Sequence, residues 1–177
     1  MLTQILLPSE AIVLRDGSRL TIRPIRPDDA PRLQALHARL SPDSIYFRFL
    51  GWHPALSEQE AERFANLDYD TRMAFVAVNE ENGEENIVAV ARYAACLPDH
   101  PDEADAAIVV EDRFQNLGLG TLLLDRLLAY ARAHGIAAFL ADINPENERM
   151  LHFIRRSGFP ASSKLAEGAL EIRIGIN

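Results

Sequence analysis

The chain has 177 residues, of which 18 are Lys or Arg and 26 are Asp or Glu, so its formal net charge is -8. This length suits one domain with a sizeable core, and 48% hydrophobic residues exclude a collagen-like or wholly disordered chain. The acidic balance argues against a nucleic-acid-coating protein, and a single Cys excludes a disulfide framework and fits a reducing compartment.

Residues 1–14 are apolar but lack the basic start of a targeting signal, and Pro8, Ser9 and Glu10 interrupt them. No apolar run approaches the ~20 residues that span a bilayer. We therefore expect a cytoplasmic protein without membrane contact, either a monomer or a homodimer. The expected organisation is one domain over residues 1–177, with residues 1–11 as an extension that docks on the body or on a neighbouring subunit.

The first half of the chain predicts a strand, three capped helices and a β-hairpin. The expected segments are a strand over 19–25, helices whose caps are Asp28, Ser41 and Ser57, and strands over 73–78 and 87–97 joined by an Asn82-Gly83 turn. The second half alternates strands and helices. Its expected segments are a strand over 104–110, a helix over 118–134, a strand over 136–143, a helix from Asn144-Pro145 to Gly158 and a strand over 170–176. This order predicts one α/β (α+β) domain.

The sharpest motif runs from Gln115 to Thr121, between a predicted strand and the longest predicted helix. The first N–H groups of a helix have no helical partner and favour an anion, and Gly118 and Gly120 remove Cβ atoms that would hold a phosphate away. The segment therefore indicates a pyrophosphate site. It has no lysine for a P-loop and no third glycine at position 123 for a Rossmann fingerprint. A purely packing role for the glycines stays open.

In its context this motif resembles the GNAT acetyltransferase family. The resemblance rests on Ile108-Val-Val110, Gln115 to Thr121, Asn147 to Leu151 and Ser157-Gly-Phe159. The N-terminal half is similar to the GNAT domain of bacterial protein lysine acetyltransferases, through Leu14 to Ser18, Thr21 to Ala30, Leu40 to Phe49 and Asp68-Tyr-Asp70. The likeness spans about residues 12 to 176.

The resemblance implies a GNAT fold, in which a mixed and strongly twisted sheet splays apart after the strand that ends at Val110. Acetyl-CoA would lie in that cleft, with its pyrophosphate on residues 115–121, and the backbone N–H of Val110 would polarise the thioester carbonyl. Asn147 would lie near the pantetheine or would merely stabilise the first turn of its helix. The expected cofactor-binding residues are Ile108, Val109, Val110, Gln115, Asn116, Gly118, Leu119, Gly120, Thr121 and Asn147.

Acetylation of an amine requires a base, because a lysine side chain with a pKa near 10.4 is protonated at neutral pH. In the family subgroup this base is a Glu, and the matching residue here is Asp105. Its shorter side chain favours a water relay, and Glu103 is the alternative base. The position that often carries a Tyr acid in the family is Ile154, so water would protonate the leaving thiolate.

Other residues give less indication of a catalytic or binding role. Cys96 beside His100 offers a thiol nucleophile, but its apolar strand indicates core packing. The histidines show no metal-ligand spacing, so no metal is expected. Trp52 either lines the acceptor site or covers the core. Residues 51–112 hold 3 Arg against 15 Asp and Glu, which predicts acidic surroundings for the base strand that attract a cationic amine.

The sequence thus predicts an acetyl-CoA-dependent N-acetyltransferase that acts by direct attack of a primary amine, with a protein lysine as the expected acceptor. Four alternatives remain open: a small amine as acceptor, a different acyl donor such as propionyl-CoA, a non-catalytic acyl-CoA-binding or sensor domain, and a structural module whose glycines only pack.

Overall fold

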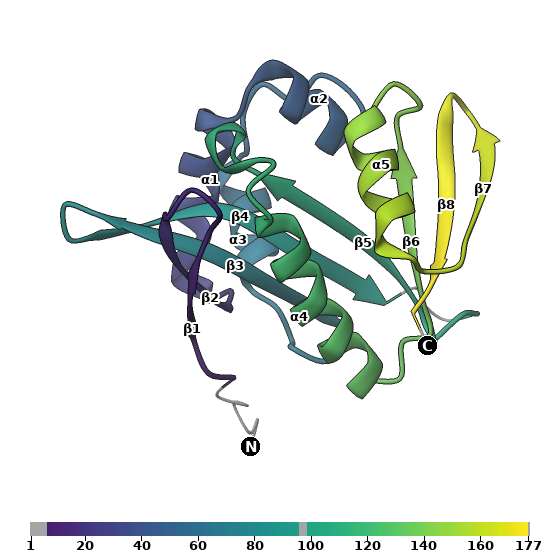
Figure 1. The fold of residues 1–177 in the computed structure, drawn as a ribbon, viewed down its shortest axis with the longest axis horizontal. Coiled ribbons are helices and arrows are strands. Elements are labelled where there is room, and N and C mark those ends of the chain that lie inside the picture. Colours follow the sequence, from purple (N-terminus) through teal and green to yellow (C-terminus); the bar gives the residue numbers. More distant parts are fainter. Residues whose placement is uncertain (1–6, 96–98, 177) are drawn as a thin grey trace.

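A computed structural model describes residues 7–95 and 99–176 (Figure 1). In this part of the chain eight strands form one mixed sheet in the order β1-β2-β3-β4-β5-β6-β8-β7. Neighbouring strands are antiparallel except β5 and β6. The strands are β1 (Glu10–Val13), β2 (Arg19–Pro24), β3 (Arg72–Glu81), β4 (Glu84–Ala95), β5 (Glu103–Val110), β6 (Ala138–Ile143), β7 (Ala161–Ala166) and β8 (Ala169–Gly175). The α/β fold class with a mixed sheet is confirmed.

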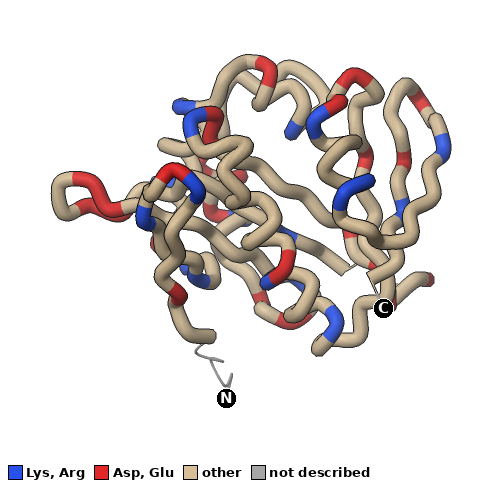
Figure 2. The backbone as a smooth tube through the Cα atoms, viewed as in Figure 1, with Lys and Arg blue, Asp and Glu red and all other residues tan. Residues whose placement is uncertain are grey.

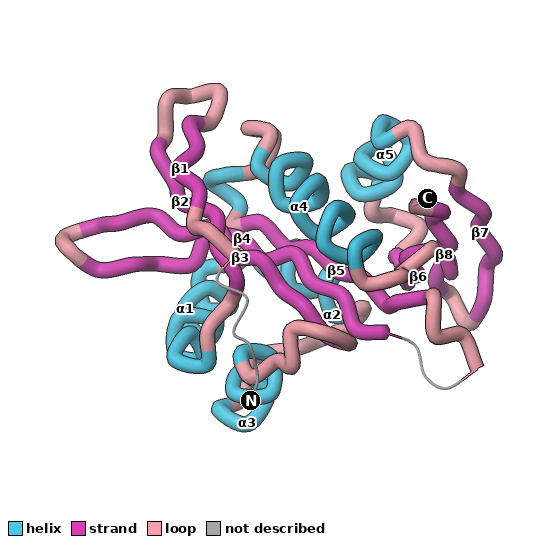
Figure 3. Tube along the Cα trace, turned by 90° about the horizontal axis from the view of Figure 1, so that it is seen from below, coloured by secondary structure: helices cyan, strands magenta, loops and turns pink. Residues whose placement is uncertain are grey.

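Helices cover both faces of the sheet (Figure 3). One face carries α4 and α5, and the other carries α1 and α3, while α2 lies beyond the end of β5 (Figure 1). The helices are α1 (Ala30–Arg39), α2 (Pro42–Phe49), α3 (Glu58–Ala65), α4 (Leu119–Ala133) and α5 (Glu148–Ser157). None of them, within the described residues, is long and apolar enough to cross a membrane.

The alternation of side chains along the central strands creates two cores, because successive residues of a strand point to opposite faces. Phe75 and Tyr93 pack with α4, whereas Val76 and Val90 pack with α1 and α3. The unbroken runs of buried apolar residues over 73–78 in β3 and 87–91 in β4 follow from this two-sided cover.

A buried ion pair joins β2 to the start of α1. The Arg23 guanidinium donates to both Asp29 carboxylate oxygens at 2.7 and 2.9 Å, and the two side chains are only 1% and 0% exposed. The Asp29 carboxylate also accepts the Arg26 N–H at 2.8 Å. The sequence prediction that Asp28 caps this helix is therefore wrong. Asp29 directly precedes the helix, and its carboxylate accepts hydrogen bonds from the Arg23 guanidinium and the Arg26 N–H.

The helix starts at Ser41 and Ser57 are confirmed, since each hydroxyl accepts an N–H three residues on. The predicted start at Asn144-Pro145 is wrong, because α5 begins after Asn147. Two strands were not predicted. β1 takes in residues 10 and 11 of the expected extension, and β7 is exposed on both faces, so it shows no apolar alternation. Residues 1–6 and Cys96 lie outside the described residues.

Candidate active site

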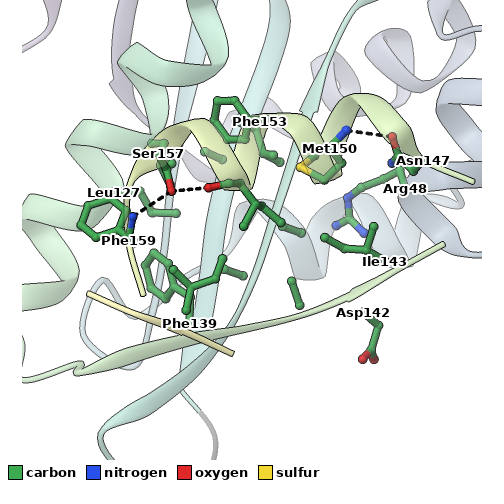
Figure 4. Close-up of a pocket in the computed structure, with 18 of the residues that line it drawn as sticks. Arg48, Leu127, Phe139, Asp142, Ile143, Asn147, Met150, Phe153, Ser157 and Phe159 are labelled. Carbon is green, nitrogen blue, oxygen red and sulfur yellow. Dashed lines mark hydrogen bonds between the residues drawn. The ribbon is translucent and has the colours of Figure 1, made fainter. Parts of the chain in front are cut away.

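A cleft opens where β5 and β6 separate. The two strands pair only between Glu103–Asp105 and Ala138–Leu140, and beyond this point they diverge toward α2 (Figure 1). Side chains of β5, β6, α4 and α5 line a pocket there, and Arg48 of α2 reaches into it beside Met150 and Ile143 (Figure 4). The predicted splay of the sheet beside the strand that ends at Val110 is thus confirmed. It begins after Asp105, and the cleft exposes one edge of β5.

Backbone hydrogen bonding decides which β5 residues face this cleft. The Glu111 N–H donates to the Val88 carbonyl at 2.8 Å, and the β4–β5 register continues without a break from there. Hydrogen-bonded and non-hydrogen-bonded pairs alternate in an antiparallel ladder. The backbone groups of Val109 therefore face β4, whereas those of Ile108 and Val110 face the cleft. This contradicts the expected backbone contact of Val109 with the pantetheine, because its N–H and C=O are already used by β4.

The loop from Gln115 to Gly118 leads directly into α4, whose first residue is Leu119. Gly118 has a φ of 91°, a conformation that side chains with a Cβ rarely adopt, and Asn116 also has a positive φ of 61°. A Cβ at Gly120 would lie 3.7 Å from Ile108 Cδ1 and from Phe153 Cε2, at the edge of the cleft. The start of α4, whose first N–H groups have no helical partner, therefore lies beside residues that line the cleft.

The other predicted residues of this segment differ in what their side chains do. The Gln115 side chain donates to the Val110 carbonyl at 2.8 Å and to the Ser44 hydroxyl at 3.2 Å, so it ties the loop to β5 and α2. Leu119 is buried in the α4 core, and Thr121 is exposed. Any contact of Leu119 with a ligand is therefore limited to its backbone.

Arg15 is a candidate binding residue that sequence reasoning missed. It lies in the turn between β1 and β2, and its Nε is 3.8 Å from the position that a Cβ of Gly118 would occupy. A cation at the start of α4 adds to the positive end of the helix dipole. About a hundred residues separate Arg15 from the loop, so no local sequence signal could have revealed this contact.

Asn147 and Ile154 belong to α5, which forms the roof of the cleft in Figure 4. The Asn147 Oδ1 accepts the Met150 N–H at 3.1 Å, so this side chain caps the helix, and the residue also lines the pocket. Ile154 is buried and lines the same pocket, where it offers no proton to a leaving group.

The two candidate bases differ in their surroundings. Asp105 is exposed, on the sheet face opposite α4, and pairs with Ala94 of β4. Glu103 lies two residues earlier on the same face, but its carboxylate accepts a 2.7 Å hydrogen bond from Arg173 and is only 15% exposed. An ion pair of this kind stabilises the carboxylate and blocks its approach to an amine. The geometry favours Asp105.

The charge distribution differs from the sequence expectation. Glu80, Glu81, Glu84 and Glu85 lie at the tip of the β3–β4 hairpin, which projects away from the cleft (Figure 2). Ten residues of strand, about 33 Å, separate Glu84 from the Ala94 that faces Asp105. Part of the acidity of residues 51–112 therefore lies at this hairpin, away from the base strand. Trp52 is 84% exposed and lines neither the pocket nor the core.

Gly120→Glu is expected to weaken acetyl-CoA binding by at least about tenfold, a loss of about 1.4 kcal/mol. The new carboxylate would enter the cleft beside Ile108 and Phe153, where it repels the pyrophosphate. Glu is a better helix former than Gly and suits a first helical turn, so the fold should persist. Calorimetric titration measures the affinity. Gly51→Glu, where a Cβ meets nothing within 4 Å, is the control, and an unchanged affinity in Gly120→Glu would contradict the assignment.

Comparisons with known proteins agree with this geometry. A family model described as an acetyltransferase (GNAT) domain matches residues 19–160. An acetyltransferase of Pseudomonas aeruginosa is 34% identical over 146 residues, which cover 82% of this chain and 77% of that protein. The acetyltransferase Pat of Mycolicibacterium smegmatis is 26% identical over 147 residues, which cover 83% of this chain and 43% of that protein.

Among solved structures, the GNAT domain of S. lividans PAT matches with a TM-score of 0.84 and 30% identity, covering 94% of this chain and 96% of that domain. Both the sequence and the arrangement of the sheet thus agree with one family, whose members transfer an acetyl group from acetyl-CoA to an amine. The chain belongs to the GNAT family and is an N-acetyltransferase.

Proposed function

We propose that the chain transfers the acetyl group of acetyl-CoA to a lysine side chain of a protein. The observation that carries this proposal is the cleft beside β5, where the backbone groups of Ile108 and Val110 face away from β4 next to the start of α4. The choice of lysine is supported by the resemblance of the N-terminal half to bacterial protein lysine acetyltransferases.

In this proposal the N–H groups at the start of α4 and the Arg15 guanidinium hold the pyrophosphate. The pantetheine extends along β5 and bonds to the backbone of Ile108 and Val110. Asn147 lines the pocket from α5, on the other side of the pantetheine. The bound molecule thus occupies the place that a further strand would take between β5 and β6.

Asp105 is the proposed general base, and it accepts a proton of the acceptor ammonium directly or through one water. The thioester carbonyl must lie near this carboxylate. Ile108 is three residues from Asp105 along β5, about 10 Å, whereas Val110 is five residues away, about 17 Å. We therefore assign the N–H that stabilises the developing oxyanion to Ile108 in place of Val110.

The amine then forms the C–N bond and the C–S bond breaks. The amine proton leaves through Asp105, and the departing thiolate takes a proton from water, because Ile154 has none to give. No covalent link to the protein is needed.

The test is an acceptor screen with the full chain and acetyl-CoA, read by thiol release and by mass spectrometry of the acceptor. We expect acetylation of lysine in peptides and little turnover of polyamines. Turnover of polyamines alone would contradict the protein acceptor. Thermal stabilisation by CoA without thiol release from any acceptor would identify a sensor domain instead. A parallel assay with propionyl-CoA in place of acetyl-CoA compares the two acyl donors.

A further inference from the structure

A second cavity adjoins the cleft on the opposite face of the sheet, between β4, β5 and the helices α1 and α3. Arg48 and Ala107 line both pockets, so the second cavity opens beside the reacting part of the cleft. An acceptor that approaches from the face of Asp105 meets this cavity first, because Ala107 and Asp105 project from the same side of β5.

Two guanidinium groups in this cavity have no anionic partner in the described parts of the chain. No ion pair or side-chain hydrogen bond of Arg48 or Arg92 occurs within residues 7–95 and 99–176, and each of the two is partly buried. Burial, together with the nearby charge of Arg48, lowers the pKa of Arg92 to about 10, so the side chain stays cationic at neutral pH. Two partly desolvated like charges raise the free energy of this site unless an anion joins them.

Aromatic rings, and not carboxylates, hold the two cations in place. The guanidinium carbon of Arg92 lies 4.4 Å from the centroid of the Phe64 ring, and that of Arg48 lies 5.0 Å from the centroid of the Phe49 ring. Phe49 is stacked in turn on His53, with ring centroids 4.0 Å apart. Cation–π contacts position a guanidinium and leave its N–H donors available.

The register places this pair close to the proposed base. Arg92 is directly opposite Ala107, and Asp105 is two residues further along β5 on the same face. Diagonal neighbours of this kind have a separation of about 7–8 Å. A molecule with an amine and an acid a few bonds apart would therefore reach Asp105 with the first group and the arginines with the second.

We infer that Arg48 and Arg92 form a carboxylate-binding subsite, which selects acceptors with an acidic group close to the reacting amine. This inference rests on the proposed acetylation of an amine. The carboxylate comes from an acidic residue beside the lysine of a protein, or from the α-carboxylate of a free amino acid. A planar guanidinium binds a carboxylate through two parallel hydrogen bonds, which gives both affinity and orientation.

The test compares acceptors that differ only in this group. Three lysine peptides carry Glu, Gln or Arg next to the lysine, and free lysine is compared with lysinamide. We expect kcat/KM for the Glu peptide to exceed that for the Gln peptide about tenfold, mainly through KM. The better of the two acidic acceptors, peptide or free lysine, identifies the source of the carboxylate.

Arg92→Gln and Arg48→Gln should each reduce the ratio between the Glu and Gln peptides to near one, whereas Arg92→Lys should keep part of it. Arg63→Gln is the matched control, because Arg63 also lies over the Phe64 ring, 5.4 Å from its centroid, but is exposed and does not line the cavity. Retained thermal stabilisation by acetyl-CoA shows that each variant is folded.

A second readout does not need turnover. Glutarate, a dicarboxylate without an amine, should raise the Tm of the wild-type protein and not that of Arg92→Gln. If no lysine compound is acetylated, the proposed lysine acceptor is wrong. The change in Tm with glutarate then remains as the test of whether Arg48 and Arg92 bind a carboxylate. Equal kcat/KM for the Glu and Gln peptides, or a preference that survives in both glutamine variants, would overturn the inference, as would a glutarate effect that does not depend on the arginines.

Discussion

Asp105→Asn is expected to lower kcat of acetyl transfer by about 10²–10⁴-fold, the usual contribution of a general base. The amide that replaces the carboxylate cannot accept the proton of the acceptor ammonium, while its size and hydrogen-bonding reach are nearly unchanged. Because Asp105 is exposed and makes no ion pair with the described residues, the substitution should not affect folding. Affinity for acetyl-CoA should stay within about twofold, since the start of α4 is untouched.

Two control variants sharpen this experiment. Glu103→Gln removes the alternative base and should lower kcat far less, because its carboxylate is engaged by Arg173. Asp102→Asn removes an exposed carboxylate just before β5 and should be neutral. Single-turnover rates at saturating acetyl-CoA separate the chemical step from product release. A large loss in Glu103→Gln with normal turnover in Asp105→Asn would reverse the assignment.

Asp29→Asn is expected to lower the free energy of unfolding at neutral pH by about 3 kcal/mol, the lower part of the range for a buried ion pair that loses one partner. Arg23 is 1% exposed and would keep its charge, with only the half-exposed Glu85 at 2.9 Å to neutralise it. Urea unfolding measures the change. Asp28→Asn, which removes an exposed neighbouring carboxylate, should stay within about 0.5 kcal/mol of the wild type.

The same pair predicts how stability depends on pH. Burial alone would raise the pKa of Asp29, but the hydrogen bonds and charge of Arg23, the Arg26 N–H and the charge of Arg32 lower it below its ordinary value. A carboxyl group with a lowered folded-state pKa stabilises the fold above its unfolded pKa, near 3.9, and loses this contribution as the pH falls through the folded value. The wild type should therefore lose stability below about pH 4 more steeply than Asp29→Asn. If the free energy of unfolding fell equally steeply with decreasing pH in the two proteins, this role of Asp29 would be contradicted.

Much of the fold was predictable because its signals are local. The caps at Ser41 and Ser57, the Asn82-Gly83 turn and the helix end at Gly158 depend on residues within one turn of each other. Capping rules failed where two residues close in the sequence could both begin the same helix, as with Asp28 and Asp29 or with Asn144 and Asn147. At the first place the contact of Asp29 with Arg23 on β2 decided the outcome. At the second, the Asn144 side chain accepts the Glu146 N–H, and Asn147 instead caps the helix through the Met150 N–H.

By itself the sequence determined the order of the main elements and membership of an acyl-transfer family, and it predicted an anion site at the start of α4, since each depends on a short motif or a periodic pattern. Only the tertiary structure decided which backbone groups of β5 face the cleft, since this depends on the register with β4. It also brought Arg15 to Gly118, and Arg48 and Arg92 into one cavity beside Ala107. These residues lie far apart along the chain, and charge counted along a sequence carries no information on which side chains the sheet and its helices place together.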